Sequence, residues 1–325
     1  MKLFSLNASR EFGEKVAASL GTPLDAHEER EFEDGEHKAR PLVSVRGEDV
    51  YIIQSLHGGP EQSPNDKLCR LLFFIATMKE NGAARVTAII PYLAYARKDR
   101  QTKSRDPVTT RYIAQLLEAV GTDRVVTMEV HNIVAFQNAF RCQTIHLDTC
   151  RLFSRAAAAI AGSGPVVIAS PDPGGVKRAQ LFREALEKSL GRPVGSAFME
   201  KRRSAGVVSG NLLVGEVRDA NVIIIDDLIA SGGTMVRAGN ACREAGARAT
   251  YAFAAHGLFT GEAATAVQQP DPVRFFVADT VPPFRLPAKV LHERIEVISA
   301  APLFAETIRR LHEGGSISDL LTGAS

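Results

Sequence analysis

The chain has 325 residues, which is long for one hydrophobic core and suits two domains. Apolar residues make up 45% of it, and the formal net charge of +2 argues against an extended polyanion-binding surface. The four cysteines form no CxxC pair, which argues against zinc and against a disulfide framework. No apolar run approaches the ~20 residues of a membrane span and no signal peptide is recognisable. We therefore expect a cytoplasmic protein with no nucleic-acid and no membrane partner.

Short β-branched runs alternate with helical patterns along the chain, which predicts βα units and mainly parallel sheets. In chain order, the predicted strands are 50–54, 86–90, 124–128, 166–169, 222–225 and 250–254. The predicted helices are 66–81, 109–119, 175–190, 234–245 and 303–312. The sequence therefore predicts an α/β fold.

Two stretches of the chain resemble each other. Residues 80–83 (Glu-Asn-Gly-Ala) and 244–247 (Glu-Ala-Gly-Ala) each end a helix on a glycine and lead into a strand. A duplicated α/β unit is the simplest interpretation. We predict an N-terminal domain over 1–148, a C-terminal domain over 149–300, and a C-terminal helix and tail over 301–325 that packs back on the first domain.

The segment after the strand 222–225 carries the clearest chemistry. Asp226 and Asp227 follow the strand, and the residues 230–234 read Ala-Ser-Gly-Gly-Thr before a helix begins. Glycines allow a tight turn whose N–H groups, with the helix N-terminus, can hold a phosphate. The two carboxylates can accept hydrogen bonds from vicinal sugar hydroxyls. A turn with an ordinary helix cap has a similar composition, but the order of the parts favours a phosphorylated pentose.

This segment resembles the ribose-5-phosphate loop of type I phosphoribosyltransferases and of ribose-phosphate diphosphokinases (PRPP synthases). The resemblance implies two similar type I phosphoribosyltransferase-like domains, each with a mainly parallel sheet flanked by helices. The implied ribose-5-phosphate contacts are Asp226, Asp227, Ala230, Ser231, Gly232, Gly233 and Thr234.

Other motifs separate PRPP synthesis from PRPP consumption. The charged turn 32–36 (Phe-Glu-Asp-Gly-Glu) resembles the PRPP-synthase segment that contacts adenine. Residues 90–100 are similar to that family's Pro-Tyr-x-x-Tyr-Ala-Arg-Gln-Asp motif, with lysine in place of the glutamine. Read alone, either stretch is a solvated loop. The ATP contacts that the resemblance implies are Phe32, Asp34, Gly35, Glu36, Arg97 and Lys98.

Two further positions match the magnesium site of the family. His131 follows a predicted strand, although its neighbours Glu129 and Val130 differ from the usual Asp-Leu. Asp172 follows another predicted strand and precedes two glycines and a basic helix. A carboxylate oxygen suits Mg²⁺, which keeps waters and takes few protein ligands. The resemblance implies Mg²⁺ as the cofactor, held at His131 and Asp172.

The basic run 200–206 (Glu-Lys-Arg-Arg-Ser-Ala-Gly) resembles the flexible catalytic loop of the family. Lys201 and Arg203 occupy its Lys-x-Arg positions, and the resemblance implies that both stabilise developing charge, with Arg203 also at the ribose 5-phosphate. An exposed cation contributes little until a loop closes and excludes water.

The implied activity is that of a ribose-phosphate diphosphokinase, which makes PRPP and AMP from Mg-ATP and ribose 5-phosphate. A PRPP-consuming phosphoribosyltransferase and a non-catalytic regulatory subunit are the alternatives. The family suggests a homo-oligomer, from dimer to hexamer, with phosphate or ADP as regulators at segments such as 44–47, 103–105 and 316–318. One departure is Ala230, which stands where the usual loop has a third acid.

Overall fold

The computed structural model describes the backbone of residues 1–204 and 207–321, and the side chains of residues 1–200 and 212–320. The chain forms two compact units. The first comprises Met1–Asp148 and the C-terminal stretch from Ala300, and the second is Thr149–Ser299. Within the described part, no helix is both long enough and apolar enough to cross a bilayer. All four cysteines are free thiols.

The first unit contains a five-stranded parallel sheet with strand order β1-β4-β5-β6-β7. A separate antiparallel hairpin, β2–β3, is inserted between α1 and β4. Its elements are β1 (Lys2–Ser5), a 3₁₀ turn (Asn7–Ser9), α1 (Arg10–Leu20), β2 (His27–Glu31), β3 (His37–Pro41), β4 (Asp49–Ile53), α2 (Pro64–Glu80), β5 (Arg85–Ile90), α3 (Thr109–Ala119), β6 (Arg124–Met128), α4 (Ile133–Ala139), β7 (Gln143–Leu147), α10 (Ala301–Glu313) and α11 (Ser318–Leu321).

Alternating side chains of β1 show which helices cover each face of this sheet. Phe4 lies in the core that the sheet shares with α2, α3 and α4. Ser5 points the other way, toward α1, where a Cβ added at Gly13 would come within 2.3 Å of the Ser5 Cβ. α10 packs beside α1, with the rings of Phe12 and Phe304 5.5 Å apart between centroids. The C-terminal helix is thus part of the first unit.

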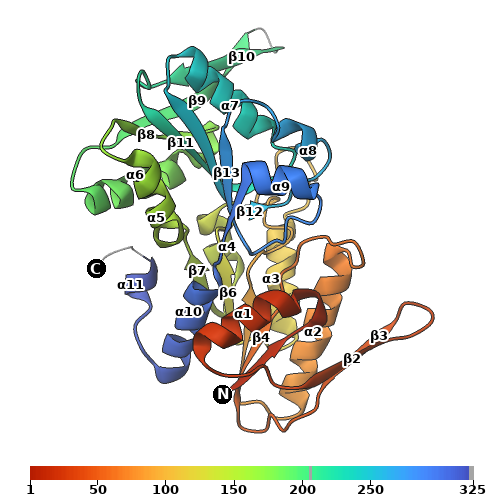
Figure 1. Cartoon of the computed structure of the whole chain (residues 1–325). Helices are drawn as coiled ribbons and strands as arrows, with labels where there is room; N and C mark the ends of the chain where they lie inside the picture. Colours follow the sequence, from red (N-terminus) through yellow and green to blue (C-terminus); the bar gives the residue numbers. More distant parts are fainter. Residues whose placement is uncertain (205–206, 322–325) are drawn as a thin grey trace. The chain divides into compact units, whose positions relative to one another are not determined.

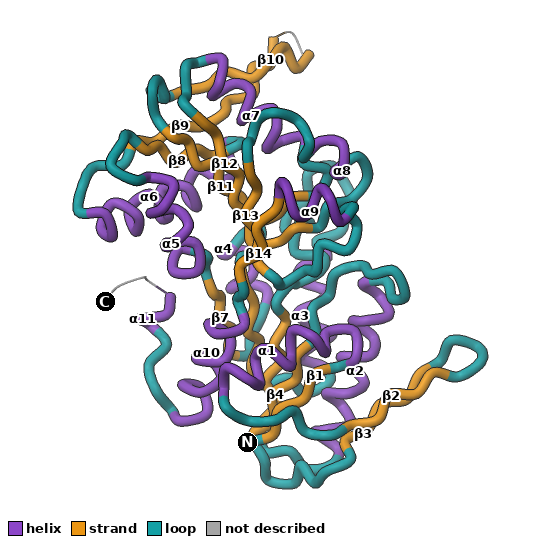
Figure 2. Tube along the Cα trace, viewed as in Figure 1, coloured by secondary structure: helices purple, strands orange, loops and turns teal. Residues whose placement is uncertain are grey.

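The second unit contains a seven-stranded sheet with strand order β10-β9-β8-β11-β12-β13-β14, parallel except for the β9–β10 pair. Strands and helices are distinguished in Figure 2. Its elements are α5 (Cys150–Ala161), β8 (Val166–Ser170), a 3₁₀ turn (Pro173–Gly175), α6 (Val176–Leu190), β9 (Gly195–Ser204), β10 (Val207–Val214), β11 (Asn221–Ile229), α7 (Gly233–Glu244), β12 (Ala249–Gly257), α8 (Ala263–Ala266), β13 (Arg274–Ala278), α9 (Ala288–Arg294) and β14 (Ile295–Ile298).

Strand β11 is buried on both faces because helices cover both sides of the second sheet. Val222 and Ile224 belong to the core formed with α7, α8 and α9, whereas Ile223 and Ile225 belong to the core formed with α5 and α6. This explains the continuous run of β-branched residues that predicts the strand. The arrangement of two mainly parallel sheets flanked by helices agrees with the predicted α/β fold.

The charged turn 32–36 connects β2 and β3, and this hairpin extends away from the rest of its unit (Figure 1). The second half of β2 is tied to α2. Arg70 of α2 lies 2.9 Å from the Glu31 carboxylate and 3.8 Å from the Glu29 carboxylate. Charged side chains dominate both strands, so hydrophobic periodicity gives no sign of them.

Candidate active site

The second sheet reverses its strand order between β8 and β11. From β8 the chain continues through α6 to β9 on one side, while β11 lies on the other side and continues through α7 to β12. The two helices consequently cover opposite faces of the sheet. In open α/β sheets, ligands bind at the carboxyl ends of the strands at such a switch point. The predicted residues Asp172, Asp226 and Asp227 come from these two strand ends.

Strand β11 continues four residues beyond its predicted end. It pairs with β12 as far as Ile229, whereas its pairing with β8 stops at Ile224. Asp226 and Asp227 therefore lie within the strand and not after it, which corrects the predicted end at Ile225. Because β8 turns away into α6, the backbone of β11 past Ile224 pairs with no strand on that side within the part of the chain that the structure describes. The acid pair lies where the sheet opens.

The two carboxyl groups are held close together in a region of low solvent exposure. The Asp226 side chain is 20% exposed and the Asp227 side chain 4%. Burial, and then the neighbouring Asp227 carboxylate, raise the pKa of Asp226 well above its ordinary value. Arg178 opposes this shift, with its Nη1 3.2 Å from Asp226 Oδ1 and 3.7 Å from Asp227 Oδ1. The sequence prediction gave Arg178 no role.

The residues after β11 form the expected turn into a helix. Gly232 is the N-cap of α7 with a φ of +79°, a conformation that suits glycine. α7 begins at Gly233, so the N–H groups of its first turn face the loop. Arg237, one turn later, donates from Nη2 to Thr234 Oγ1 at 3.3 Å. Backbone donors, two hydroxyls and the positive helix end together suit a phosphate monoester.

Asp172 follows the end of β8 at Ser170 and is the N-cap of the 3₁₀ turn Pro173–Gly175, which contains the two glycines. Its Oδ1 accepts a hydrogen bond from the Gly175 N–H at 3.1 Å, and Ser170 Oγ donates to the Asp172 carbonyl oxygen at 2.6 Å. Gly175 has no room for a side chain, since an added Cβ would lie 2.7 Å from Ser170 Oγ. This short turn fixes where α6 begins.

The predicted catalytic residues Lys201 and Arg203 lie on the backbone of β9, paired with β10 at Asn211 and Val208. The segment 201–204 is therefore strand, which corrects its interpretation as a loop. Pairing with β10 stabilises the extended conformation of this segment. The hydrophobic periodicity of 201–204 alone does not show that a partner strand is present. The side chains of Lys201 and Arg203 lie outside the part of the chain that the structure describes.

The turn predicted to contact adenine is in the first unit. Phe32 is 42% exposed, and its backbone N–H donates to the Glu36 carbonyl oxygen at 2.7 Å. Asp34 Oδ1 accepts from the Glu36 N–H at 3.1 Å, and Gly35 has a φ of +88°. The guanidinium of Arg30 lies 5.3 Å from the centre of the Phe32 ring. The turn thus presents one aromatic face beside acidic groups.

The two expected ATP contacts after β5 differ in their environments. Arg97 is exposed, whereas Lys98 donates from Nζ to Asp106 Oδ2 at 2.5 Å and to Thr102 Oγ1 at 2.9 Å. The hydrogen bond from Lys98 is the main cause that lowers the pKa of Asp106. Lys98 therefore organises its own loop.

His131 follows β6, and the loops after β5 and β6 meet beside it. Asn132 donates from Nδ2 to Asp99 Oδ2 at 2.6 Å, and its Oδ1 caps α4. Glu129 has a φ of +40°, which is a costly conformation for a residue with a side chain and is often retained at functional sites. Arg97 and His131 thus belong to neighbouring loops of the first unit.

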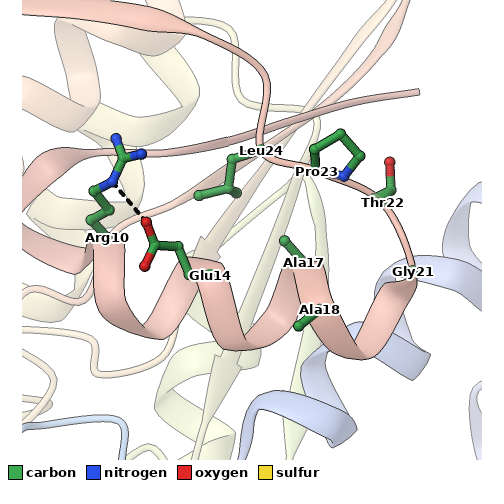
Figure 3. A pocket seen from close by; sticks show the side chains of 8 residues that line it. All are labelled: Arg10, Glu14, Ala17, Ala18, Gly21, Thr22, Pro23 and Leu24. Carbon is green, nitrogen blue, oxygen red and sulfur yellow. Dashed lines mark hydrogen bonds and ion pairs between the residues drawn. The ribbon is translucent and has the colours of Figure 1, made fainter.

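No group of three or more His, Cys, Asp or Glu side chains that could hold a metal occurs among the described residues. His131 belongs to the first unit and Asp172 to the second. A hollow of about 520 Å³ runs along α1 (Figure 3), but its charged lining is one exposed ion pair, Arg10–Glu14, and it includes none of the predicted site residues.

Comparison with known proteins gives the same family along the whole chain. Residues 1–121 match the N-terminal domain of ribose phosphate pyrophosphokinase, and residues 209–322 match the phosphoribosyl synthetase-associated domain. A ribose-phosphate pyrophosphokinase of Caldanaerobacter subterraneus is 37% identical over 323 residues, covering 99% of this chain and 98% of that protein. Ribose-phosphate pyrophosphokinase 1 of Streptococcus pyogenes is 35% identical, covering 98% of this chain and 97% of its own length.

The crystal structure of phosphoribosylpyrophosphate synthetase from Mycobacterium smegmatis has a similar fold. Its TM-score is 0.85 at 33% identity, and the match covers 97% of this chain and 99% of that one. This confirms the predicted fold of two mainly parallel sheets flanked by helices. The relatives named above are more than 30% identical to this chain along nearly its full length, and two family models of the same family match its two parts. The chain belongs to the ribose-phosphate pyrophosphokinase (PRPP synthetase) family.

Proposed function

We propose that the chain is an active ribose-phosphate diphosphokinase that transfers the β,γ-diphosphoryl group of Mg-ATP to the C1 hydroxyl of ribose 5-phosphate, giving PRPP and AMP. The observation that carries the proposal is the arrangement of groups at the switch point between β8 and β11. A buried acid pair and a glycine-rich helix N-terminus lie in sequence along one strand and the loop that follows it. They suit the hydroxyl and phosphate ends of one sugar phosphate.

In this proposal the second unit binds the acceptor. Asp226 and Asp227 accept hydrogen bonds from the vicinal hydroxyls of the ribose. The backbone N–H groups and hydroxyls from Ser231 to Thr234 hold the 5-phosphate, with Ala230 at the start of the loop. Binding at both ends fixes the direction in which the C1 hydroxyl points, and such orientation is a main source of rate in phosphoryl transfer.

The first unit supplies the proposed ATP contacts. The aromatic face of Phe32 stacks on the adenine, with Asp34, Gly35 and Glu36 at its edge. The exposed guanidinium of Arg97 suits a phosphate, because its planar fork matches an oxyanion. Lys98 acts by holding the loop through Asp106. Lys201 and Arg203 stabilise the charge that develops during transfer.

His131 and Asp172 are the proposed protein contacts of Mg²⁺. A carboxylate oxygen is a ligand that Mg²⁺ prefers, and this ion usually keeps several waters and takes few protein ligands. The nucleotide phosphates and water would supply its remaining ligands. When bound, Mg²⁺ would neutralise phosphate charge during transfer.

Incubation with ATP, Mg²⁺ and ribose 5-phosphate tests the proposal. A synthetase forms AMP only when ribose 5-phosphate is present, whereas a phosphoribosyltransferase consumes PRPP and forms none. The Lys201→Ala variant should lose roughly 10²–10³-fold in turnover while remaining folded. Formation of no AMP by the folded wild-type protein would refute the activity and favour a regulatory subunit. A folded Lys201→Ala variant within a few-fold of wild type would refute the role of Lys201.

Family membership also supports proposals about assembly and regulation. We propose a cytoplasmic homo-oligomer of dimers assembled into a hexamer, with activation by phosphate and inhibition by ADP. Sedimentation and activity measured from zero to millimolar phosphate test these points. A monomer, or a flat response to phosphate, would reject the corresponding proposal.

A further inference from the structure

Arg178 forms ion pairs with both carboxylates of the acid pair on β11. It lies in the first turn of α6, and its side chain is only 16% exposed. Its Nη1 is 3.2 Å from Asp226 Oδ1 and 3.7 Å from Asp227 Oδ1. A single guanidinium therefore pairs with both carboxylates that the proposed function assigns to the ribose hydroxyls.

The local backbone determines where this guanidinium lies. Asp172 caps the 3₁₀ turn after β8 through the Gly175 N–H, and Ser170 Oγ bonds to the Asp172 carbonyl oxygen. α6 starts directly after this turn, and Ala179 faces the core with Phe182. Arg178 consequently lies on the side of the helix that faces β11, while its neighbour Lys177 is exposed and bonds to Gln180 at 3.4 Å.

The acid pair needs a cation if it is to accept hydrogen bonds. Burial and the Asp227 carboxylate raise the pKa of Asp226, and Arg178 lowers it. Asp227 and Arg178 are thus two charged groups with opposite effects on the Asp226 carboxyl. A protonated carboxyl can donate to a sugar hydroxyl from its OH, but it loses much of its strength as an acceptor. Removal of Arg178 would keep a proton on the pair up to higher pH.

We propose that Arg178 is a positioning residue for ribose 5-phosphate: it orients the Asp226 and Asp227 carboxylates and keeps them ready to accept two vicinal hydroxyls. The guanidinium acts through the acids and has no direct contact with the reacting atoms. This inference rests on the proposed function, because it presumes that the acid pair binds the sugar.

The test compares Arg178→Gln, which removes the charge, with Arg178→Lys, which keeps it, and with Lys177→Gln as the matched control. Steady-state kinetics in each substrate are measured from pH 6 to 9. We expect Arg178→Gln to raise KM for ribose 5-phosphate about ten- to hundred-fold and to leave KM for ATP within two-fold. The acidic limb of kcat/KM for ribose 5-phosphate should move to higher pH. In Arg178→Lys the acidic limb should lie close to its wild-type pH, and Lys177→Gln should match wild type in both KM values and in the pH of this limb.

Calorimetric binding of ribose 5-phosphate without ATP makes the test independent of turnover. If the wild-type protein forms no AMP, the proposed activity fails, and the binding comparison alone decides the role of Arg178. If Arg178→Gln does not fold, the pH limb and binding affinity of Arg178→Lys decide it. Wild-type affinity and an unshifted limb in the folded variant would overturn the inference. An equal rise of KM for both substrates would overturn it as well.

Discussion

Substitution of Gly232 by alanine tests the geometry of the proposed phosphate loop. Gly232 has a φ of +79°, and a residue with a Cβ in this left-handed region costs about 1–2 kcal/mol. The added Cβ would also lie 3.2 Å from the Ala266 Cβ of α8, so α8 or the loop must shift. Because 1 kcal/mol corresponds to roughly 2–4 °C for a domain of this size, Gly232→Ala should lower Tm by about 2–8 °C.

Gly233→Ala is the matched variant one residue later. Gly233 is the first residue of α7, where alanine is about 1 kcal/mol more favourable than glycine at an interior position. The added Cβ would meet two side-chain atoms, Arg237 Nη1 at 3.3 Å and Ser231 Oγ at 3.8 Å. Stability should therefore be unchanged or slightly higher. The methyl group would, however, stand in the proposed phosphate site.

Thermal unfolding and steady-state kinetics together separate the two effects. Gly232→Ala should lose both stability and affinity for ribose 5-phosphate. Gly233→Ala should keep its Tm while KM for ribose 5-phosphate rises about tenfold or more and KM for ATP stays unchanged. A Gly233→Ala variant with wild-type KM for the sugar would refute the placement of the 5-phosphate. A Gly232→Ala variant with wild-type Tm would refute the strain argument.

Two further predictions concern charged groups. The pKa of Asp226 is raised, so ionisation of this carboxyl costs the folded state stability as pH rises above the ordinary pKa of aspartate, and the cost is complete once pH passes the raised value. Asp226→Asn should therefore have a higher Tm than wild type at pH 8, with a smaller gain near pH 4, yet fail to bind ribose 5-phosphate in calorimetry. A lower Tm at pH 8 would contradict this. Lys98→Met removes the hydrogen bond to Asp106, so trypsin should cleave the loop 97–105 of this variant faster. The control is Lys103→Met, which also removes one lysine from the loop but an exposed one. Equal cleavage rates in the two variants would contradict the role of Lys98.

The core elements of both sheets could be predicted from the sequence because their burial leaves a clear pattern. Val222 to Ile225 are apolar on both faces, and this run gives a central strand without any tertiary information. The hairpin β2–β3 could not be predicted in this way. Its residues are mostly charged and gain their extended conformation from pairing with each other and from Arg70 of α2.

In the candidate site too, features that depend on neighbouring residues could be predicted from the sequence, whereas features that depend on distant parts of the chain could not. The loop from Ser231 to Thr234 depends on glycine conformation and a helix start, which are encoded locally. The continuation of β11 through Asp226 depends on its ladder with β12, which periodicity in one strand does not show. The sequence reveals a basic start of α6, but only the packing of that helix distinguishes Arg178 from Lys177.

Phosphorus-31 NMR of the complete reaction tests the central claim most directly. With ATP, Mg²⁺ and ribose 5-phosphate, we predict that the α-phosphorus becomes the monoester of AMP. The β- and γ-phosphorus signals should become those of a diphosphate attached to C1 of the sugar, in equal amount. Release of inorganic phosphate or pyrophosphate in place of that diphosphate ester, or no dependence on ribose 5-phosphate, would contradict the proposed transfer.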